Sequence, residues 1–321
     1  MATYLVTGAT GHQGGAVVTS LLASGAKVHA VVRDPTSPAS LALQQKGVTL
    51  FQGNFESPDP SFKLAAASCT GIFLNPSFFD PSVAQGQASA ILAACRAGAG
   101  PGLMTTVVLS STTRVQQWSD SNFRDTVTGI DPMLGYYYGA KAGVEAAVRE
   151  AEGFKHYTIL RPGVLHYDYM MPVSAFAVPD LPRRAEIWHS LEDGAVMPHT
   201  DENDVGKYAA AALLEADRFS GEEFALASEN LSAEDVASIM GRVSGVEVKV
   251  HKRTKEEVQQ TMKSGTPTQK FELLQGKLPA RVDTEAVQKK YGIKLATLEE
   301  YLTRNKEALL ESLPPKTEGK F

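Results

Sequence analysis

The chain has 321 residues, of which 43% are hydrophobic and 21% are charged. These values are ordinary for a folded protein with one large or two smaller domains. The formal net charge of −5 argues against a nucleic-acid partner, because proteins that bind phosphate backbones are usually basic. No stretch approaches the length of apolar sequence that spans a bilayer, so we expect no membrane segment.

The cysteine content and the start of the chain indicate a cytoplasmic protein. The two cysteines, Cys69 and Cys95, lie in apolar segments, which is typical of buried, reduced thiols. The first strand begins within a few residues of Met1, so we expect no signal peptide. No group of side chains has the spacing of metal ligands, and we expect no metal site.

The segment 7–14 reads TGATGHQG and lies between an apolar strand at 4–6 and an apolar-striped helix at 14–22. Gly8 permits a sharp turn, Gly11 leaves space for a pyrophosphate, and Gly14 lets the helix approach the strand. The helix N-terminus adds unpaired N–H donors and a partial positive charge. The context predicts a dinucleotide-binding loop, to which we assign Gly8, Thr10, Gly11, His12, Gln13 and Gly14.

Strand and helix signals alternate through the first half of the chain. We expect further strands at 27–33, 48–52, 72–74, 106–109 and 157–160, with a long helix at 136–152. Ser37-Pro38, Asp59-Pro60 and Asp80-Pro81 predict the starts of three other helices. Repeated β-α units with apolar strands predict an α/β fold with a doubly wound parallel sheet, covered on both faces.

The pattern changes after residue 163. Residues 164–199 are rich in methionine, aromatic residues and proline, and helical periodicity returns at 203–216 before a strand at 223–227. The remainder is mostly helical, with capping boxes predicted at Ser232/Asp235, Thr254/Glu257 and Thr297/Glu300.

The end of the second strand indicates which dinucleotide binds. The residue about 20 positions after the glycines contacts the adenosine ribose in this fold, and that position is Arg33. A guanidinium pairs with a 2′-phosphate, which favours NADP(H). Asp34 is the alternative, since a shift of one residue would place a carboxylate there and favour NAD.

Two asparagines follow other predicted strands. Asn54 is placed to contact the adenine edge, although an Asx turn explains it equally well. Asn75 ends the fourth strand near the expected nicotinamide ribose. We therefore include both among the candidate cofactor contacts.

Tyr137 and Lys141 are four residues apart on a predicted helix, which places the phenol and the ammonium on one face. A neighbouring cation favours the phenolate and lowers a tyrosine pKa toward the range of acid–base catalysis. Lys141 could also hold the nicotinamide ribose. An ordinary surface pair is the alternative, but the pair opens the helix that follows the fifth strand.

The fifth strand ends in hydroxyl groups. Ser111 and Thr112 lie at its carboxyl end, the edge that faces the ligand in open α/β sheets. Either one could orient a substrate oxygen, and strand alternation does not decide between them. The other interpretation is that these hydroxyls bond to a loop backbone.

These residues together resemble the NmrA-like family, an atypical branch of the short-chain dehydrogenase/reductase superfamily. The resemblance rests on the TGATGHQGG opening, on VRDP at 32–35, on KAGVE at 141–145, on LRPG at 160–163 and on the segment 297–306. It adds Pro162 and Gly163 to the expected cofactor contacts. Sensor-type members commonly lack the tyrosine four residues before the lysine, whereas this chain has Tyr137.

The resemblance implies two domains. We expect residues 1–164 to form an NADP-binding Rossmann domain, to which the chain returns around 200–228. We expect residues 165–321 to form a smaller, mostly helical substrate-binding domain. The Met- and aromatic-rich stretch 166–188 could line an apolar pocket, although such residues more often pack one lobe on another.

The sequence thus predicts an NADPH-dependent reductase of a small carbonyl, quinone or imine. The nicotinamide would deliver hydride and Tyr137 the proton. One alternative is a non-enzymatic NADP(H) sensor that binds a protein partner. Another is a lyase, isomerase or cyclase that uses the nucleotide only structurally. We expect a small-molecule substrate, no nucleic-acid or membrane partner, and a monomer or homodimer.

Overall fold

The computed structural model describes residues 2–77 and 80–315. The chain divides into two compact units, and each is described by itself. The first unit comprises the chain up to Trp118, Tyr136–Pro162 and Glu202–Ala225. The second comprises Ser119–Gly135, Gly163–Asp201 and the chain from Leu226 onward.

The first unit is built on a seven-stranded sheet with the strand order β10-β6-β5-β4-β1-β2-β3. Its six strands from β6 to β3 are all paired in parallel. This order, with β1 in the interior and the chain winding outward in both directions, confirms the doubly wound α/β fold. The strands are β1 (Thr3–Val6), β2 (Lys27–Val32), β3 (Thr49–Gln52), β4 (Cys69–Leu74), β5 (Thr106–Ser110), β6 (His156–Pro162) and β10 (Glu222–Leu226).

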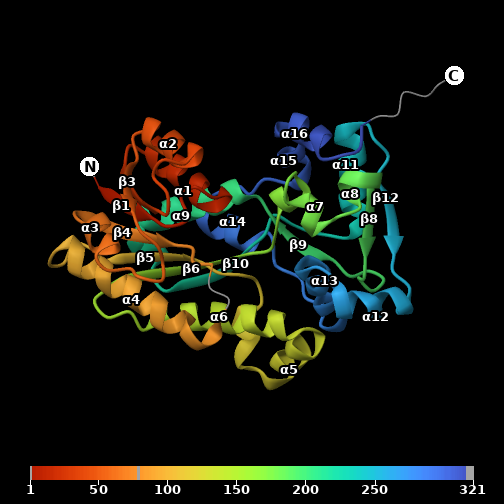
Figure 1. The fold of residues 1–321 in the computed structure, drawn as a ribbon, viewed down its shortest axis with the longest axis horizontal. Coiled ribbons are helices and arrows are strands. Elements are labelled where there is room, and N and C mark those ends of the chain that lie inside the picture. The colour runs from red at the N-terminus through yellow and green to blue at the C-terminus, as the bar shows by residue number, and fades with distance from the viewer. Residues whose placement is uncertain (1, 78–79, 316–321) are drawn as a thin grey trace. The chain divides into compact units, whose positions relative to one another are not determined.

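Helices cover both faces of this sheet (Figure 1). They are α1 (His12–Ala23), α2 (Pro38–Gln45), α3 (Ser61–Ala65), α4 (Pro81–Ala99), α6 (Pro132–Arg149), α9 (Glu202–Leu214) and α10 (Ala216–Phe219), and a 3-10 turn, η1 (Val115–Ser119), follows β5. Helices α1 and α9 pack on each other, and α3 packs on α4. In Figure 1, α1 and α9 lie on one side of the sheet, and α4 and α6 lie on the other.

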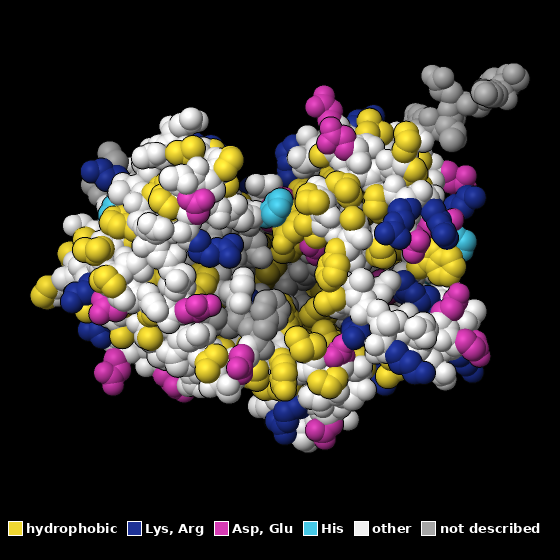
Figure 2. All heavy atoms as spheres, viewed as in Figure 1, with side chains coloured by type: hydrophobic (Ala, Val, Ile, Leu, Met, Phe, Trp, Pro, Cys, Tyr) yellow, Lys and Arg dark blue, Asp and Glu magenta, His cyan; other side chains and the backbone are white. Residues whose placement is uncertain are grey.

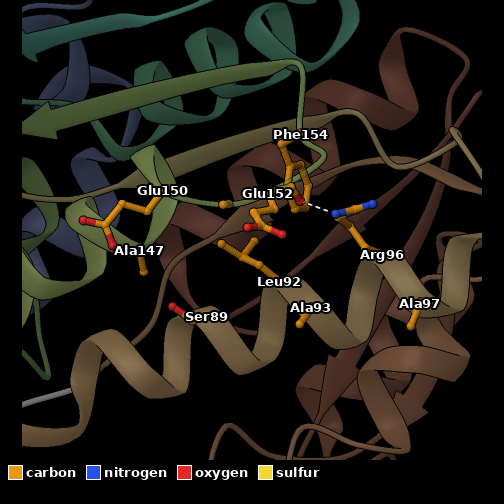
Figure 3. Close-up of a pocket in the computed structure, with 10 residues that line it drawn as sticks. Ser89, Leu92, Ala93, Arg96, Ala97, Ala147, Glu150, Glu152 and Phe154 are labelled. Carbon is orange, nitrogen blue, oxygen red and sulfur yellow. Dashed lines mark hydrogen bonds between the residues drawn. The ribbon is translucent and has the colours of Figure 1, made fainter.

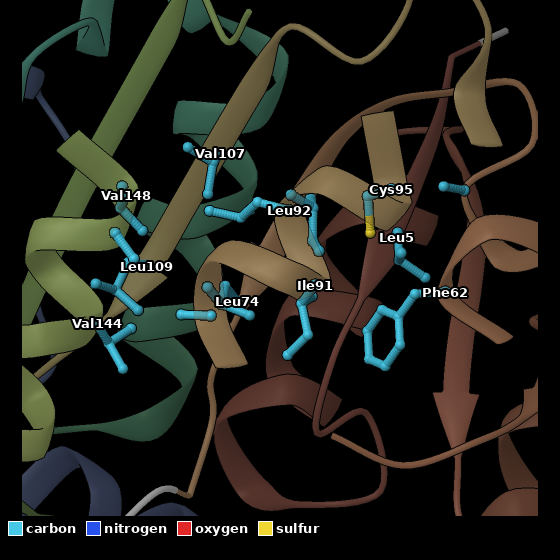
Figure 4. Close-up of a cluster of buried hydrophobic side chains, with 14 of the residues drawn as sticks. Leu5, Phe62, Leu74, Ile91, Leu92, Cys95, Val107, Leu109, Val144 and Val148 are labelled. Carbon is cyan, nitrogen blue, oxygen red and sulfur yellow. The ribbon is translucent and has the colours of Figure 1, made fainter. Parts of the chain in front are cut away.

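The hydrophobic core beneath α3, α4 and α6 explains why the strand sequences are apolar. It combines Leu5, Leu74 and Leu109 of the sheet with Phe62 of α3 and Ile91 of α4, all at most 1% exposed (Figure 4). Strand side chains alternate between faces, and both faces are covered here. The strands therefore read as continuous apolar runs rather than as alternating ones.

The second unit is mostly helical and contains two small sheets. One has the order β11-β9-β7 and the other pairs β12 with β8. The strands are β7 (Val164–Leu165), β8 (Glu186–His189), β9 (Met197–Thr200), β11 (Glu229–Leu231) and β12 (Lys249–Lys252). The helical elements are α5 (Ser121–Ile130), η2 (His166–Tyr169), α7 (Ser174–Ala177), α8 (Leu181–Arg184), α11 (Ala233–Ser244), α12 (Lys255–Ser264), α13 (Pro267–Lys277), α14 (Ala286–Tyr291), α15 (Leu298–Arg304) and α16 (Lys306–Glu311).

Several helix starts agree with the sequence predictions, and two do not. The three predicted capping boxes form, and Thr266 with Gln269 forms a fourth. The prediction for Asp59 was wrong, because Pro60 is the N-cap of α3 and makes no side-chain capping bond. Helix α6 begins at Pro132, four residues before the expected start.

No helix within the described residues is both long enough and apolar enough to cross a membrane. On the face shown in Figure 2, lysine and arginine side chains are interspersed with aspartate and glutamate. Such mixing gives no broad basic surface on that face for a phosphate backbone.

Candidate functional site

The loop between β1 and α1 has the geometry that a pyrophosphate requires. Gly8 adopts φ +62°, a conformation that side-chain-bearing residues rarely adopt. A Cβ on Gly14 would lie 2.2 Å from the carbonyl oxygen of Gly8, so only glycine lets the helix approach this closely. Gly11 is the N-cap of α1 and provides no capping side chain, and the first turn carries no acidic residue. The positive end of the helix is thus available to an anion.

A pocket of about 630 Å³ opens beside this loop. That volume lies within the range of small-molecule and cofactor sites. Phe55 and Phe62 supply apolar surface on which an adenine could pack. Six of the predicted cofactor contacts line the pocket, namely Gly8, Thr10, Gly11, Arg33, Asn54 and Asn75. The other six, His12, Gln13, Gly14, Lys141, Pro162 and Gly163, are not among its lining residues.

Arg33 and Asp34 are used differently. The Arg33 guanidinium makes no ion pair with any residue in 2–77 or 80–315, and the residue lines the pocket. The Asp34 carboxylate accepts hydrogen bonds from the backbone N–H and the hydroxyl of Thr36, at 2.8 and 2.6 Å. These two bonds hold the pKa of Asp34 below its usual value. Asp34 therefore shapes the turn, and Arg33 presents its charge to the pocket.

The two asparagines also differ. Asn54 Oδ1 accepts from the backbone N–H groups of Glu56 and Ser57, each at 2.9 Å, which is the Asx turn weighed as the alternative. Its amide NH₂ group remains the part that a nucleotide could meet. Asn75 donates its backbone N–H to the Thr7 hydroxyl at 2.8 Å, which ties the end of β4 to the glycine loop.

The end of β5 brings together hydroxyls with different partners. Ser110 donates to Gln13 Oε1 at 2.6 Å and so links β5 to α1, a contact that the sequence did not indicate. Ser111 is 5% exposed, and its hydroxyl has no hydrogen-bond partner among the described residues. A buried hydroxyl without a partner is costly unless a ligand or water meets it. Thr112 is half-buried.

Tyr137 and Lys141 lie on one face of α6. The Lys141 Nζ is 5.9 Å from the centroid of the Tyr137 ring. Burial lowers the pKa of Lys141 to about 8, and the negative charge of Glu145 opposes this shift. Tyr138 is buried and stacks on Trp118 with 6.3 Å between ring centroids, whereas Tyr136 is exposed. Of the three consecutive tyrosines, Tyr137 alone is therefore half-buried beside a cation.

An ion-pair network holds α6 against the sheet. Glu145 is 2% exposed and accepts from Arg161 Nε at 2.9 Å, from Arg161 Nη2 at 2.7 Å and from Arg149 Nη2 at 2.7 Å. Arg161 and Arg149 also bind Glu223 of β10. This network was not predicted from the sequence, although Glu145 and Arg149 have the i, i+4 spacing of a helical ion pair.

Pro162 and Gly163 lie where β6 ends. The carbonyl of Pro162 accepts from the backbone N–H of Thr113, which prolongs the contact between the two strand ends. A Cβ on Gly163 would lie 2.2 Å from the carbonyl oxygen of Pro198, and Gly163 donates its N–H to the Thr200 hydroxyl at 2.9 Å. Close backbone packing therefore accounts for glycine at this position.

A second hollow of about 500 Å³ in the first unit contains none of the predicted site residues. It is lined by α4, α6 and the turn that contains Glu152 and Phe154, and the Arg96 side chain crosses it to the carbonyl of Glu152 (Figure 3). Because this hollow contains none of the predicted site residues, we place the candidate site at the glycine loop and α6 instead. The described residues contain no group of three or more His, Cys, Asp and Glu that could hold a metal ion.

The sequence model of the NmrA-like family matches residues 2–302. The chain therefore belongs to the NmrA-like family, as the sequence resemblance indicated. No curated protein matches the chain.

Solved structures with the same fold include both a regulator and reductases. NmrA, a negative transcriptional regulator in complex with NADP, has a TM-score of 0.68 and 17% identity, with 96% of each chain covered. Triphenylmethane reductase from Citrobacter sp. has a TM-score of 0.66 and 20% identity, covering 96% of this chain and 99% of the reductase. An NADPH-dependent quinone oxidoreductase from Escherichia coli has a TM-score of 0.69 and 18% identity, with coverage of 94% and 99%. At these identities the likeness shows the fold.

Proposed function

We propose that this protein is an NADPH-dependent reductase of a small apolar or aromatic carbonyl, quinone or imine. The observation that carries the proposal is the pair formed by Tyr137 and Lys141, in which a half-buried ammonium lies 5.9 Å from the centre of a tyrosine ring. Two reductases of the same fold, one acting on triphenylmethane dyes and one on quinones, support this class of reaction.

The pocket beside the glycine loop supports NADP(H) as the cofactor. Gly8, Gly11 and Gly14 would bring the loop backbone and the α1 N-terminus to the pyrophosphate. Arg33 would pair with the 2′-phosphate, since its guanidinium has no carboxylate partner among the described residues. When bound, NADPH supplies the hydride.

The chain's own residues would handle the proton and the substrate oxygen. Tyr137 would donate its phenolic proton to the oxygen or nitrogen that gains negative charge. Lys141, as an ammonium, would stabilise the resulting phenolate and hold the nicotinamide ribose. Ser111 or Thr112 would donate a hydrogen bond to the substrate oxygen; the unpartnered hydroxyl of Ser111 favours that residue.

The test is NADPH oxidation over a panel of carbonyls, quinones and imines. Tyr137→Phe removes only the phenolic hydroxyl, so we expect kcat/KM to fall by roughly 100-fold or more while the NADPH Kd stays unchanged. Tyr136→Phe is the matched control, because Tyr136 is exposed and should tolerate the change. Full activity of Tyr137→Phe would remove the tyrosine from the mechanism.

A non-catalytic NADP(H) sensor is the second candidate, because the regulator NmrA shares the fold and binds NADP. It predicts tight NADPH binding without turnover on any member of the panel, together with capture of a protein partner that depends on the nucleotide. A lyase, isomerase or cyclase would instead form product without net oxidation of NADPH.

A further inference from the structure

Four charged side chains of the first unit form a cluster that the proposed reductase mechanism does not use. They are Glu145 and Arg149 of α6, Arg161 of β6 and Glu223 of β10. Glu145 follows Lys141 by four residues, so both side chains lie on one face of α6. The cluster therefore begins one helical turn beyond the lysine that would hold the nicotinamide ribose.

The two arginines hold the Glu145 carboxylate in place. Arg161 donates from Nε to Oε1 at 2.9 Å and from Nη2 to Oε2 at 2.7 Å. This bidentate contact fixes the orientation of the carboxylate. Arg149 Nη2 donates to Oε2 as well, at 2.7 Å. The side chains of Arg161 and Glu145 are only 6% and 2% exposed, so water competes little for these bonds.

Glu223 balances the second positive charge. Its Oε1 accepts from Arg149 Nε at 2.6 Å, and its Oε2 accepts from Arg149 Nη2 at 2.8 Å and from Arg161 Nη2 at 2.6 Å. The hydrogen bond from Arg149 holds the pKa of Glu223 below its usual value. Two carboxylates thus face two guanidinium groups, and the cluster carries no net charge.

Lys141 is not a member of this cluster. Its Nζ makes no hydrogen bond or ion pair with any residue in 2–77 or 80–315, and it contacts the ring of Tyr137. On an isolated helix Lys141 could pair with Glu145, because opposite charges at this spacing attract each other. Here the arginines bind that carboxylate instead. Burial lowers the pKa of Lys141, and the charge of Glu145 opposes this shift.

We propose that the cluster is a charge clamp for the Tyr137/Lys141 pair, with Glu145 and Arg149 as positioning residues. It keeps a carboxylate near enough to support the Lys141 ammonium, and it prevents the two side chains from closing into an ion pair. The ammonium is then free to meet the tyrosine phenolate and the ribose. This role rests on the proposed function, in which Lys141 serves both groups.

The clamp has opposite effects through its two kinds of charge. Loss of the negative charge at Glu145 leaves positive charge in excess near Lys141 and disfavours the ammonium. Loss of the positive charge at Arg149 leaves negative charge in excess and favours the ammonium. A cluster that only fastened α6 to the sheet would not give effects of opposite sign, because both losses would loosen the same contact.

Glu145→Gln and Arg149→Gln test the proposal, since each removes one charge of the clamp. The protonation of Lys141 is followed by NMR through its Cε signal in the full chain labelled with [13C]lysine. Lys141→Arg identifies that signal by its absence. We expect the midpoint of the titration to move to lower pH in Glu145→Gln and to higher pH in Arg149→Gln, each by roughly half a pH unit or more.

Arg218→Gln is the matched control for Arg149→Gln. Arg218 belongs to the same unit, and its ion pair with Glu215 lies at the surface, so its loss should leave the midpoint unchanged. If Glu145→Gln does not fold, Glu223→Gln removes the same charge at a side chain that is 22% exposed and should move the midpoint in the same direction. Shifts of the same sign for the two kinds of charge, or shifts no larger than that of the control, overturn the proposal.

The titration of Lys141 needs no substrate, so it tests the clamp even if no compound of the panel is reduced. The pH profile of NADPH oxidation in the same variants tests the reductase proposal. Midpoints that move as expected, with an alkaline decline of kcat/KM that does not follow them, would support the clamp and contradict the assigned role of Lys141 in turnover.

Discussion

Lys141 carries its charge where water is partly excluded, and this has a consequence for pH dependence. Burial disfavours the ammonium and lowers its pKa to about 8, from an ordinary value of 10.5. The protonated form therefore dominates below pH 8 and is lost as the pH rises through that value. We expect kcat/KM for NADPH-dependent reduction to decline above about pH 8, because the neutral amine no longer stabilises the phenolate.

A pH profile from roughly 6 to 10 checks this expectation. Lys141→Arg is the control, since a guanidinium stays charged throughout that range. If this variant retains activity, its alkaline decline should move to higher pH. A decline at the same pH in both proteins would assign the titration to a different group.

Arg33 determines cofactor choice in this proposal. Arg33→Ala removes the charge that would meet a 2′-phosphate and leaves every other pocket residue in place. We expect the NADPH Kd to rise by roughly 10- to 100-fold, the range for a lost hydrogen bond to a charged group. The NADH Kd should hardly change. Calorimetric titrations measure both dissociation constants. Lys46→Ala is the charge-matched control, because Lys46 is exposed. An equal loss of affinity for both nucleotides in Arg33→Ala contradicts the assignment.

At the scale of one element, the two neighbouring glycines of α1 make a direct comparison. A Cβ on Gly14 would lie 2.2 Å from the Gly8 carbonyl oxygen, whereas on Gly15 it would meet the Ala9 carbonyl oxygen at 3.5 Å. Gly14→Ala should push the loop from the helix and raise the NADPH Kd by about tenfold or more. Gly15→Ala should leave binding intact and stabilise the protein by about 0.5–1 kcal/mol, since alanine favours helix. Equal nucleotide affinity in both variants would contradict this account.

The elements also show what a sequence can and cannot predict. The capping boxes at Ser232, Thr254 and Thr297 were predicted because their residues lie within one turn and interact locally. The glycine loop was predicted for the same reason. Helix α5 was missed even though its signals are local, since Asp120 caps it and Phe123, Val127 and Ile130 form its buried face.

In the candidate site, too, local contacts could be predicted from the sequence and long-range contacts could not. The Tyr137/Lys141 face follows from helical periodicity alone. The link from Ser110 to Gln13 joins residues 97 positions apart, and the bonds from Arg161 to Glu145 depend on how β6 lies against α6. No spacing rule reports such contacts. The sequence did not decide between an adenine contact and an Asx turn for Asn54, because an asparagine directly after a strand fits both.

At the scale of the whole molecule, the chain leaves the first unit after Pro162 and returns to it at Glu202. The returning helix α9 packs closely on α1 at Gly206, since a Cβ on Gly206 would lie 2.6 Å from the backbone of Ala16. Gly206→Ala should therefore reduce the free energy of unfolding by about 1–3 kcal/mol through overpacking. Urea unfolding measures this change.

Gly241→Ala is the control for that substitution. Gly241 also lies within a helix, but its added Cβ would meet only the Val246 carbonyl oxygen at 3.5 Å. The helix-forming tendency of alanine should then raise the free energy of unfolding by up to about 1 kcal/mol. A similar loss of stability in both variants would mean that the contact between α9 and α1 is not tightly packed.

Because α9 and β10 lie late in the sequence, the first unit can be completed only late in translation. Helix α1 is translated near the beginning, but α9, which packs on it, and β10, which pairs with β6, follow only after residue 201. A nascent chain that ends before Glu202 therefore carries an apolar α1 surface with no cover, and one that ends before Glu222 has a sheet edge with no partner strand. Ribosome-bound chains of increasing length should first retain the nucleotide once β10 has emerged, and shorter ones should be substrates for chaperones.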